Sequence, residues 1–184
     1  MADIVGIDHS LRCPGRLCKD PSSIGTFPHG GTDLGEALRI EFVAEQSTRP
    51  IIGEEYGGEP LDYIVRHQSP YLLCLMRGFP TEMMQLAFPG GSGSGSTATV
   101  SYPGAAAADA GYLASTRSVK LLFSPQDTTN QLAIVLYEAV PLFDESARMQ
   151  MMITEELGMA VVFRALRTSG DAVCQIARLG SISL

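Results

Sequence analysis

The sequence predicts a mainly β protein with two packed antiparallel sheets, sandwich-like or barrel-like, flanked by one short α-helix, with a long N-terminal arm and long loops. Three observations predict this fold class. Several segments alternate apolar and polar side chains with the period of two typical of half-buried strands. Turn-forming residues separate these segments. Only one short segment has helical spacing of its apolar residues. The 184 residues suit a single domain.

Residues 1–33 are expected to form an irregular N-terminal arm, because prolines and glycines recur there without periodicity. A single β-rich domain is expected over residues 34–184. Its first strand is predicted over 37–44, where apolar and charged residues alternate. Residues 46–50 are predicted to break the sheet before a new strand, and residues 53–60 to form an exposed loop.

Two further strands are predicted over 63–66 and 71–76, around a turn at 67–70. The best helix candidate is 80–88, which starts with a proline and carries apolar residues on one face. Residues 89–118 form a Gly/Ser/Ala-rich insertion, expected to be a surface loop. It is not a phosphate-binding loop, because no Gly-Lys-Ser/Thr follows its glycines.

The C-terminal third is predicted to be a β meander, with a hairpin turn at 168–171. Its strands are expected at 119–123, 132–140, 147–155, 159–166 and 173–179. The run 159–166 is nearly all apolar, which indicates burial on both faces. The whole chain thus supplies seven or eight strands.

Charge is sparse and acidic. Charged residues make up 18% of the chain, and its net charge is −7. Seven acids and two arginines lie in residues 36–62, which therefore carry most of that net charge. The chain has only two lysines, Lys19 and Lys120, and is therefore poorly suited to binding phosphates. An acidic surface also repels DNA. No signal peptide is visible, and the apolar runs are far shorter than the ~20 residues of a membrane helix, so we expect no membrane association.

No catalytic, cofactor or metal site is predicted. The histidines are isolated beside turns, and no pair of cysteines has C-x-x-C spacing. Cys74 and Cys174 lie in apolar runs and are expected to be buried as small hydrophobic residues. Cys13 and Cys18 flank a turn, which leaves a disulfide or a metal open there. Glu54-Glu55 and Glu155-Glu156 are adjacent pairs, and neighbouring side chains on a strand point to opposite faces.

The order of segments resembles the tail-tube (major tail) proteins of tailed phages over about residues 30–184. An alternating strand at 38–42 is followed by an acidic loop, the apolar strand 71–76 and a short helix. Later come Leu122–Pro125, a long strand ending in Ala139-Val140-Pro141, and the closing segments 161–166 and 175–179. The likeness is one of pattern, without an invariant motif.

This resemblance implies two β-sheets packed across each other, and a ring, usually a hexamer, whose subunits form a continuous inner barrel. It implies stacked rings in a virion tail, assembled in the host cytoplasm, through which DNA passes without specific binding. The implied partners are other copies of the chain, a tape-measure protein, a tail terminator, a baseplate and a sheath where one exists. It also implies that residues 1–33 and 45–62 contact a neighbouring subunit.

An acidic lumen would repel DNA and let it slide. We therefore expect some of the acids in this region to line the lumen or the ring junctions; the candidates are Glu41, Glu45, Glu54, Glu55, Glu59 and Asp62. Related roles stay open: a tail terminator or baseplate ring, or the tube protein of a bacterial injection system. Two alternatives belong to other functional classes: an enzyme, and a β-barrel module that binds small molecules.

Overall fold

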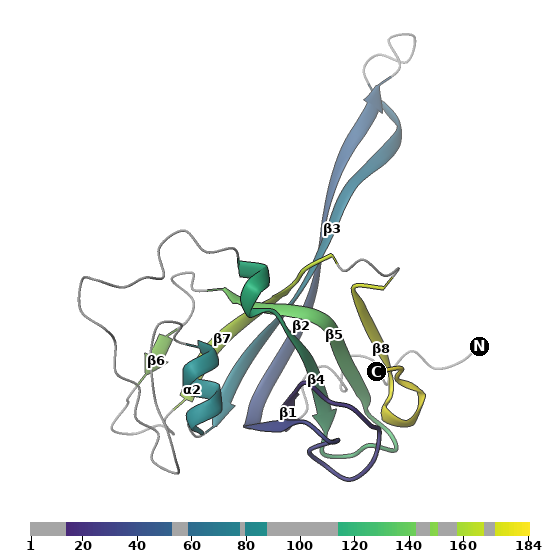
Figure 1. The fold of residues 1–184 in the computed structure, drawn as a ribbon. Coiled ribbons are helices and arrows are strands. Elements are labelled where there is room, and N and C mark those ends of the chain that lie inside the picture. The colour runs from purple at the N-terminus through teal and green to yellow at the C-terminus, as the bar shows by residue number, and fades with distance from the viewer. Residues whose placement is uncertain are drawn as a thin grey trace, which may run out of the picture.

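The described residues fold around a closed antiparallel β-barrel, with one short α-helix among them beside it (Figure 1). The structure is a computed structural model, which describes residues 14–52, 59–77, 80–87, 114–142, 148–150, 158–167 and 172–184. Its elements, in chain order, are β1 (Gly15–Lys19), β2 (Thr32–Ile52), β3 (Pro60–Arg77), α2 (Thr81–Ala87), η2 (Ala114–Arg117), β4 (Val119–Pro125), β5 (Leu132–Leu142), β6 (Arg148–Gln150), β7 (Gly158–Ala165), β8 (Cys174–Arg178) and η3 (Leu179–Ser181). The predicted mainly β fold with one short helix is confirmed, in its barrel-like form.

Six strands close the barrel in the order β7, β3, β2, β1, β4 and β5. Strand β5 closes the ring, because its residues Ala139–Leu142 pair with β7 while its earlier residues pair with β4. All of these pairings are antiparallel. The two remaining strands extend the sheet: β6 pairs with β7, and β8 pairs with β5.

The barrel interior is filled with side chains. Alternate residues of each strand point inward, as the pleat requires, so Phe123 and Phe163 are fully buried there together with Ile40 and Leu136. Met83 and Ala87 of α2 belong to the same cluster. A small barrel packed in this way has no channel of its own.

A second, smaller core covers the outside of β1, β4 and β5. Cys18, Leu122 and Val135 point away from the barrel interior and pack under Leu179 and Ile182 of the C-terminal segment. The Tyr137 hydroxyl lies 3.1 Å from Gln175 Oε1 and donates to the Ser183 carbonyl oxygen at 3.0 Å. The backbone N–H of Ser183 donates to the same Gln175 oxygen at 3.0 Å. These contacts hold the C-terminal segment against β5 and β8.

Two predicted interruptions in the first half of the chain are wrong. Residues 46–50 do not break the strand, and 67–70 do not form a turn, because β2 and β3 are each continuous. A register shift between Ser47 and Thr48 accommodates the irregular sequence as a bulge. The prolines that suggested breaks lie where each strand is paired on one side only, and a strand edge tolerates a residue without an N–H.

Two other predictions need correction. Gly15–Lys19, expected within an irregular arm, is strand β1 and lies between β2 and β4 in the barrel. The last two strands do not form a hairpin with each other, because β8 pairs with β5 and not with β7. Residues 168–171, most of 147–155 and the insertion up to residue 113 lie outside the described residues.

Phe163 provides a test of the filled barrel. Phe163→Ala removes a fully buried ring and should lower the free energy of unfolding by about 3–5 kcal/mol. Urea denaturation followed by far-UV circular dichroism measures this change. Ile176→Ala, at a side chain that is 39% exposed, is the control and should change it by less than about 1 kcal/mol. Similar losses for the two variants would contradict the packed interior.

Candidate functional site

The strands β2 and β3 continue past the barrel as a two-stranded arm, which projects from it (Figure 1). We define the arm as Ala44–Ile52 of β2 and Pro60–Pro70 of β3. Strand β1 pairs with β2 only as far as Ala37, and β7 pairs with β3 only from Tyr71 onward. In the arm, therefore, the two strands pair only with each other. Nine strand residues span about 30 Å at 3.3 Å per residue.

Toward the tip of the arm, one face is mostly apolar. Because Pro50 pairs with Tyr63 and Thr48 with Val65, the alternation of side chains places Pro50, Ile52, Tyr63 and Val65 on one face, together with Thr48. Leu61 lies next to them, at a register shift opposite Ile52. We call Pro50, Ile52, Leu61, Tyr63 and Val65 the apolar face. Ile52 is 58% exposed, Leu61 57% and Tyr63 56%. Contiguous exposed apolar side chains of this kind mark interaction surfaces.

The opposite face of the arm is mixed. It carries Arg49 and Ile51 from β2, and Asp62 and Ile64 from β3. Ile51 and Ile64 are also exposed. An isolated two-stranded ribbon is only marginally stable in water, so a partner that covers the arm would bury apolar surface and stabilise the ribbon at the same time.

The candidate acids lie along this arm and at its base. Glu41 is exposed and forms an ion pair with Arg39 at 3.2 Å. Glu45 forms an ion pair at 3.4 Å with Arg164 of β7, which links the base of the arm to the barrel. Both members of this second pair are about half exposed, so it contributes up to about 1 kcal/mol.

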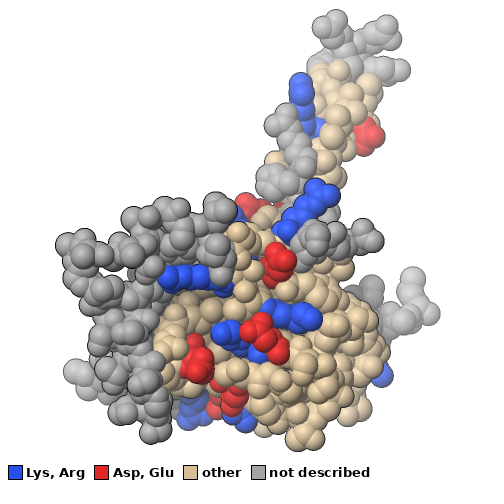
Figure 2. Space-filling view, in the orientation of Figure 1, with Lys and Arg blue, Asp and Glu red and all other residues tan. Residues whose placement is uncertain are grey.

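The remaining acids lie nearer the tip or outside the described residues. Glu59 is exposed and directly precedes β3. Asp62 is exposed on the mixed face, and its Oδ1 accepts a hydrogen bond from the Tyr63 backbone N–H at 2.7 Å. Glu54 and Glu55 lie outside the described residues. On the face shown in Figure 2, acidic and basic side chains lie beside one another and form no continuous acidic patch.

The sequence prediction missed the apolar face. It recognised the acids of residues 36–62 but treated 53–60 as the exposed loop and 63–66 as an ordinary strand. The sequence did contain a signal for an exposed apolar surface. Leu61–Val65 has four apolar residues among five, and this run lies next to acids and turn formers. The continuity of β2 and β3 was the information that was lacking.

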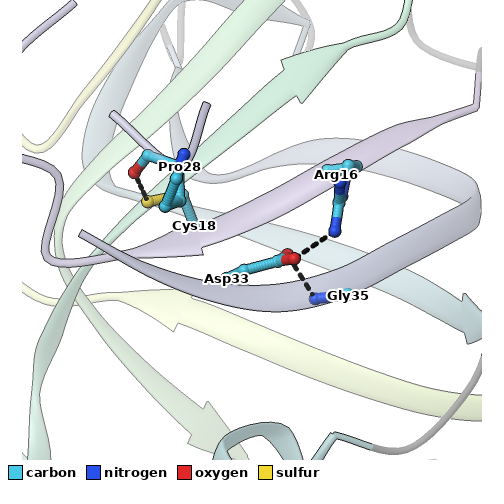
Figure 3. A network of polar contacts seen from close by, with 5 residues as sticks. All are labelled: Arg16, Cys18, Pro28, Asp33 and Gly35. Carbon is cyan, nitrogen blue, oxygen red and sulfur yellow. Dashed lines mark hydrogen bonds and ion pairs between the residues drawn. The ribbon is translucent and has the colours of Figure 1, made fainter. Parts of the chain in front are cut away.

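The described cysteines are buried or half-buried thiols. The Cys18 Sγ donates to the Pro28 carbonyl oxygen at 2.7 Å (Figure 3), and burial raises its pKa to about 11. Burial also raises the pKa of the Cys74 and Cys174 thiols. A raised pKa keeps a thiol protonated and unreactive. Cys18 is a free thiol, while Cys13 lies outside the described residues.

The described ranges contain no cluster of three or more His, Cys, Asp or Glu that could hold a metal ion. Across the same ranges, no helix has the length and apolar character needed to span a bilayer. The chain matches no protein-family model, and no curated protein matches its sequence.

Thiol reactivity checks the burial of the cysteines. In the folded protein at pH 8, Cys18 and Cys74 should react with iodoacetamide much more slowly than Cys174, which is only partly buried. Peptide mass spectrometry measures the rates separately. In urea the three rates should become similar. Modification of Cys18 or Cys74 as fast as Cys174 in the folded protein would contradict the structure.

Proposed function

We propose that this chain is a structural subunit of a phage tail tube, which assembles into stacked rings, with six subunits in each. The rings conduct DNA during ejection without binding it specifically. The observation that carries the proposal is the arm, whose apolar face is exposed in the single chain. Its partners are other copies of the chain, and at the tube ends a tail terminator and a baseplate, with a tape-measure protein inside and a sheath outside where one exists.

The arm supports assembly because its length and composition favour contact with another molecule. It extends about 30 Å from the point where β2 and β3 lose their other strand partners. Its exposed apolar residues cannot reach the filled interior of their own barrel. A second copy supplies a partner that is always present at the same concentration, and a repeated contact from one copy to the next builds rings or tubes.

The filled barrel and the acids support the placement of the lumen between subunits. Ion pairs engage Glu41 and Glu45, while no ion pair of Asp62 or Glu59 is found in the part of the chain that the structure describes. Among the described candidate acids, Asp62 and Glu59 are thus best suited to a DNA-repelling lumen or ring junction. A structure of the assembled tube with all of the candidate carboxylates on its outer surface would contradict this placement.

The assembly is tested on the apolar face. The triple variant Leu61→Thr, Tyr63→Thr and Val65→Thr keeps strand-forming residues but removes the three apolar side chains that β3 contributes to the apolar face, and it should remain a folded monomer. Light scattering after size-exclusion chromatography and negative-stain microscopy compare it with the wild-type chain, which should form rings or tubes with a central hole.

Ile176→Thr is the matched control, because it makes the same kind of change at an exposed strand residue outside the arm. This control should assemble like the wild-type chain. A wild-type chain that stays monomeric at high concentration would overturn the proposal. If the wild-type chain and the triple variant assembled equally well, the arm would not be the assembly contact.

A further inference from the structure

A cavity on the outside of the barrel lies far from the tip of the arm. Its floor is a row of polar side chains on three adjacent strands: Arg16 of β1 pairs with Glu36 of β2 on one side and with Ser124 of β4 on the other. The loop before β2 forms one wall through Phe27 and His29, and the turn after β4 forms another. The cavity has a volume of about 690 Å³, within the range of small-molecule sites.

His29 is the unsatisfied group of this cavity. His29 lines the cavity, yet the residue is only 2% exposed, and apart from a weak hydrogen bond with the Gly25 backbone neither ring nitrogen has a partner. The backbone fixes its position, because the N–H groups of Ser22 and Ser23 both donate to the His29 carbonyl oxygen, at 2.9 and 3.0 Å. A buried polar group without a partner costs free energy until one is supplied.

The protonation state of His29 determines what it can bind. Burial lowers the pKa of its imidazole, and the nearby Gly25 backbone opposes this shift only in part. Near neutral pH the ring is therefore uncharged, with one N–H donor and one nitrogen acceptor. Such a ring suits a ligand group that both donates and accepts, and a hydroxyl group does both.

The charges around the cavity largely offset one another. The Arg16 guanidinium forms an ion pair with Asp33, which also accepts from the Gly35 N–H at 2.9 Å (Figure 3). It also lies 4.5 Å from the centre of the Phe27 ring. Among the described residues, Glu36 has no ion pair. The cavity lining itself contains one cation, Arg16, and one carboxylate, Glu36, so it favours neither an anionic nor a cationic ligand.

The other residues that line the cavity supply both hydrogen-bonding groups and apolar contacts. Hydroxyls of Ser124 and Thr128 and the amide of Gln126 add donors and acceptors, while Phe27 and Leu179 supply apolar contact. A sugar ring presents both kinds of surface, since its hydroxyls donate and accept and its C–H groups are apolar. We propose that this cavity binds a neutral polyhydroxylated ligand, a mono- or disaccharide unit. This site does not depend on the assembly of the chain.

Protein-observed NMR tests the site with a fixed panel of probes: glucose, galactose, mannose, N-acetylglucosamine, maltose and lactose. At least one should shift the amide signals of residues 25–27, His29 and residues 126–128, and the His29 ring nitrogens, in a saturable way with a Kd in the millimolar range. Sodium acetate and ammonium chloride at the same concentrations are the charged comparisons, and neither should give saturable shifts there.

Two variants locate the effect. Glu36→Gln, at the cavity floor, should weaken the binding at least threefold. Glu82→Gln, an exposed acid of α2 that does not line the cavity, should leave it unchanged. Absence of saturable shifts for every sugar with the protein folded would overturn the proposal. So would saturation by acetate or ammonium instead, or equal affinity for the wild-type chain and Glu36→Gln.

Discussion

Closure of the barrel by β5 is the constraint on which the rest of the structure depends. This strand pairs with β4 and β8 along its first part, and with β7 at its end. Without the second pairing, β5 and β7 would each expose backbone groups that invite uncontrolled pairing with other chains. Closure also surrounds the interior side chains, so that Phe123 and Phe163 are fully buried.

From Ala44 onward in β2, and up to Pro70 in β3, the two strands pair with no other strand of the barrel. This part of the two strands is therefore available for another role. The arm costs stability in the single chain, since two strands alone bury little apolar surface. Burial of its apolar face by another molecule would offset this cost. The Glu45–Arg164 pair links the base of the arm to β7, and this contact reduces the set of directions in which the arm can point.

Much of the fold was predictable from local patterns, because the barrel strands are alternating or continuously apolar runs bounded by turn formers. The strands around Ile40, Leu122, Ile134 and Val161 were predicted, as was the helix that places Met83 in the core. Strand partners were not predictable, since the pairing of β8 with β5 depends on contacts distant in sequence. Proline is a local signal with two meanings, a break or an edge, and only the pairing on each side distinguishes them.

The candidate site was predicted in part for the same reason. Composition located the acids, and the structure places four of the six along the arm or at its base. Which residues share a face depends on register, and register could not be obtained from the acids alone. The cavity around His29 was not predictable either, because it joins Arg16, Glu36 and Ser124 from three separate strands.

The most direct measurement of the central claim is hydrogen–deuterium exchange in the arm at low and at high protein concentration, followed by mass spectrometry of the peptide covering residues 60–66. If another copy covers the apolar face, exchange in this peptide slows strongly at the concentration where assemblies form, while exchange in a β4 peptide is unchanged. Exchange in residues 60–66 that stays equally fast in assembled and dissociated protein would contradict the account.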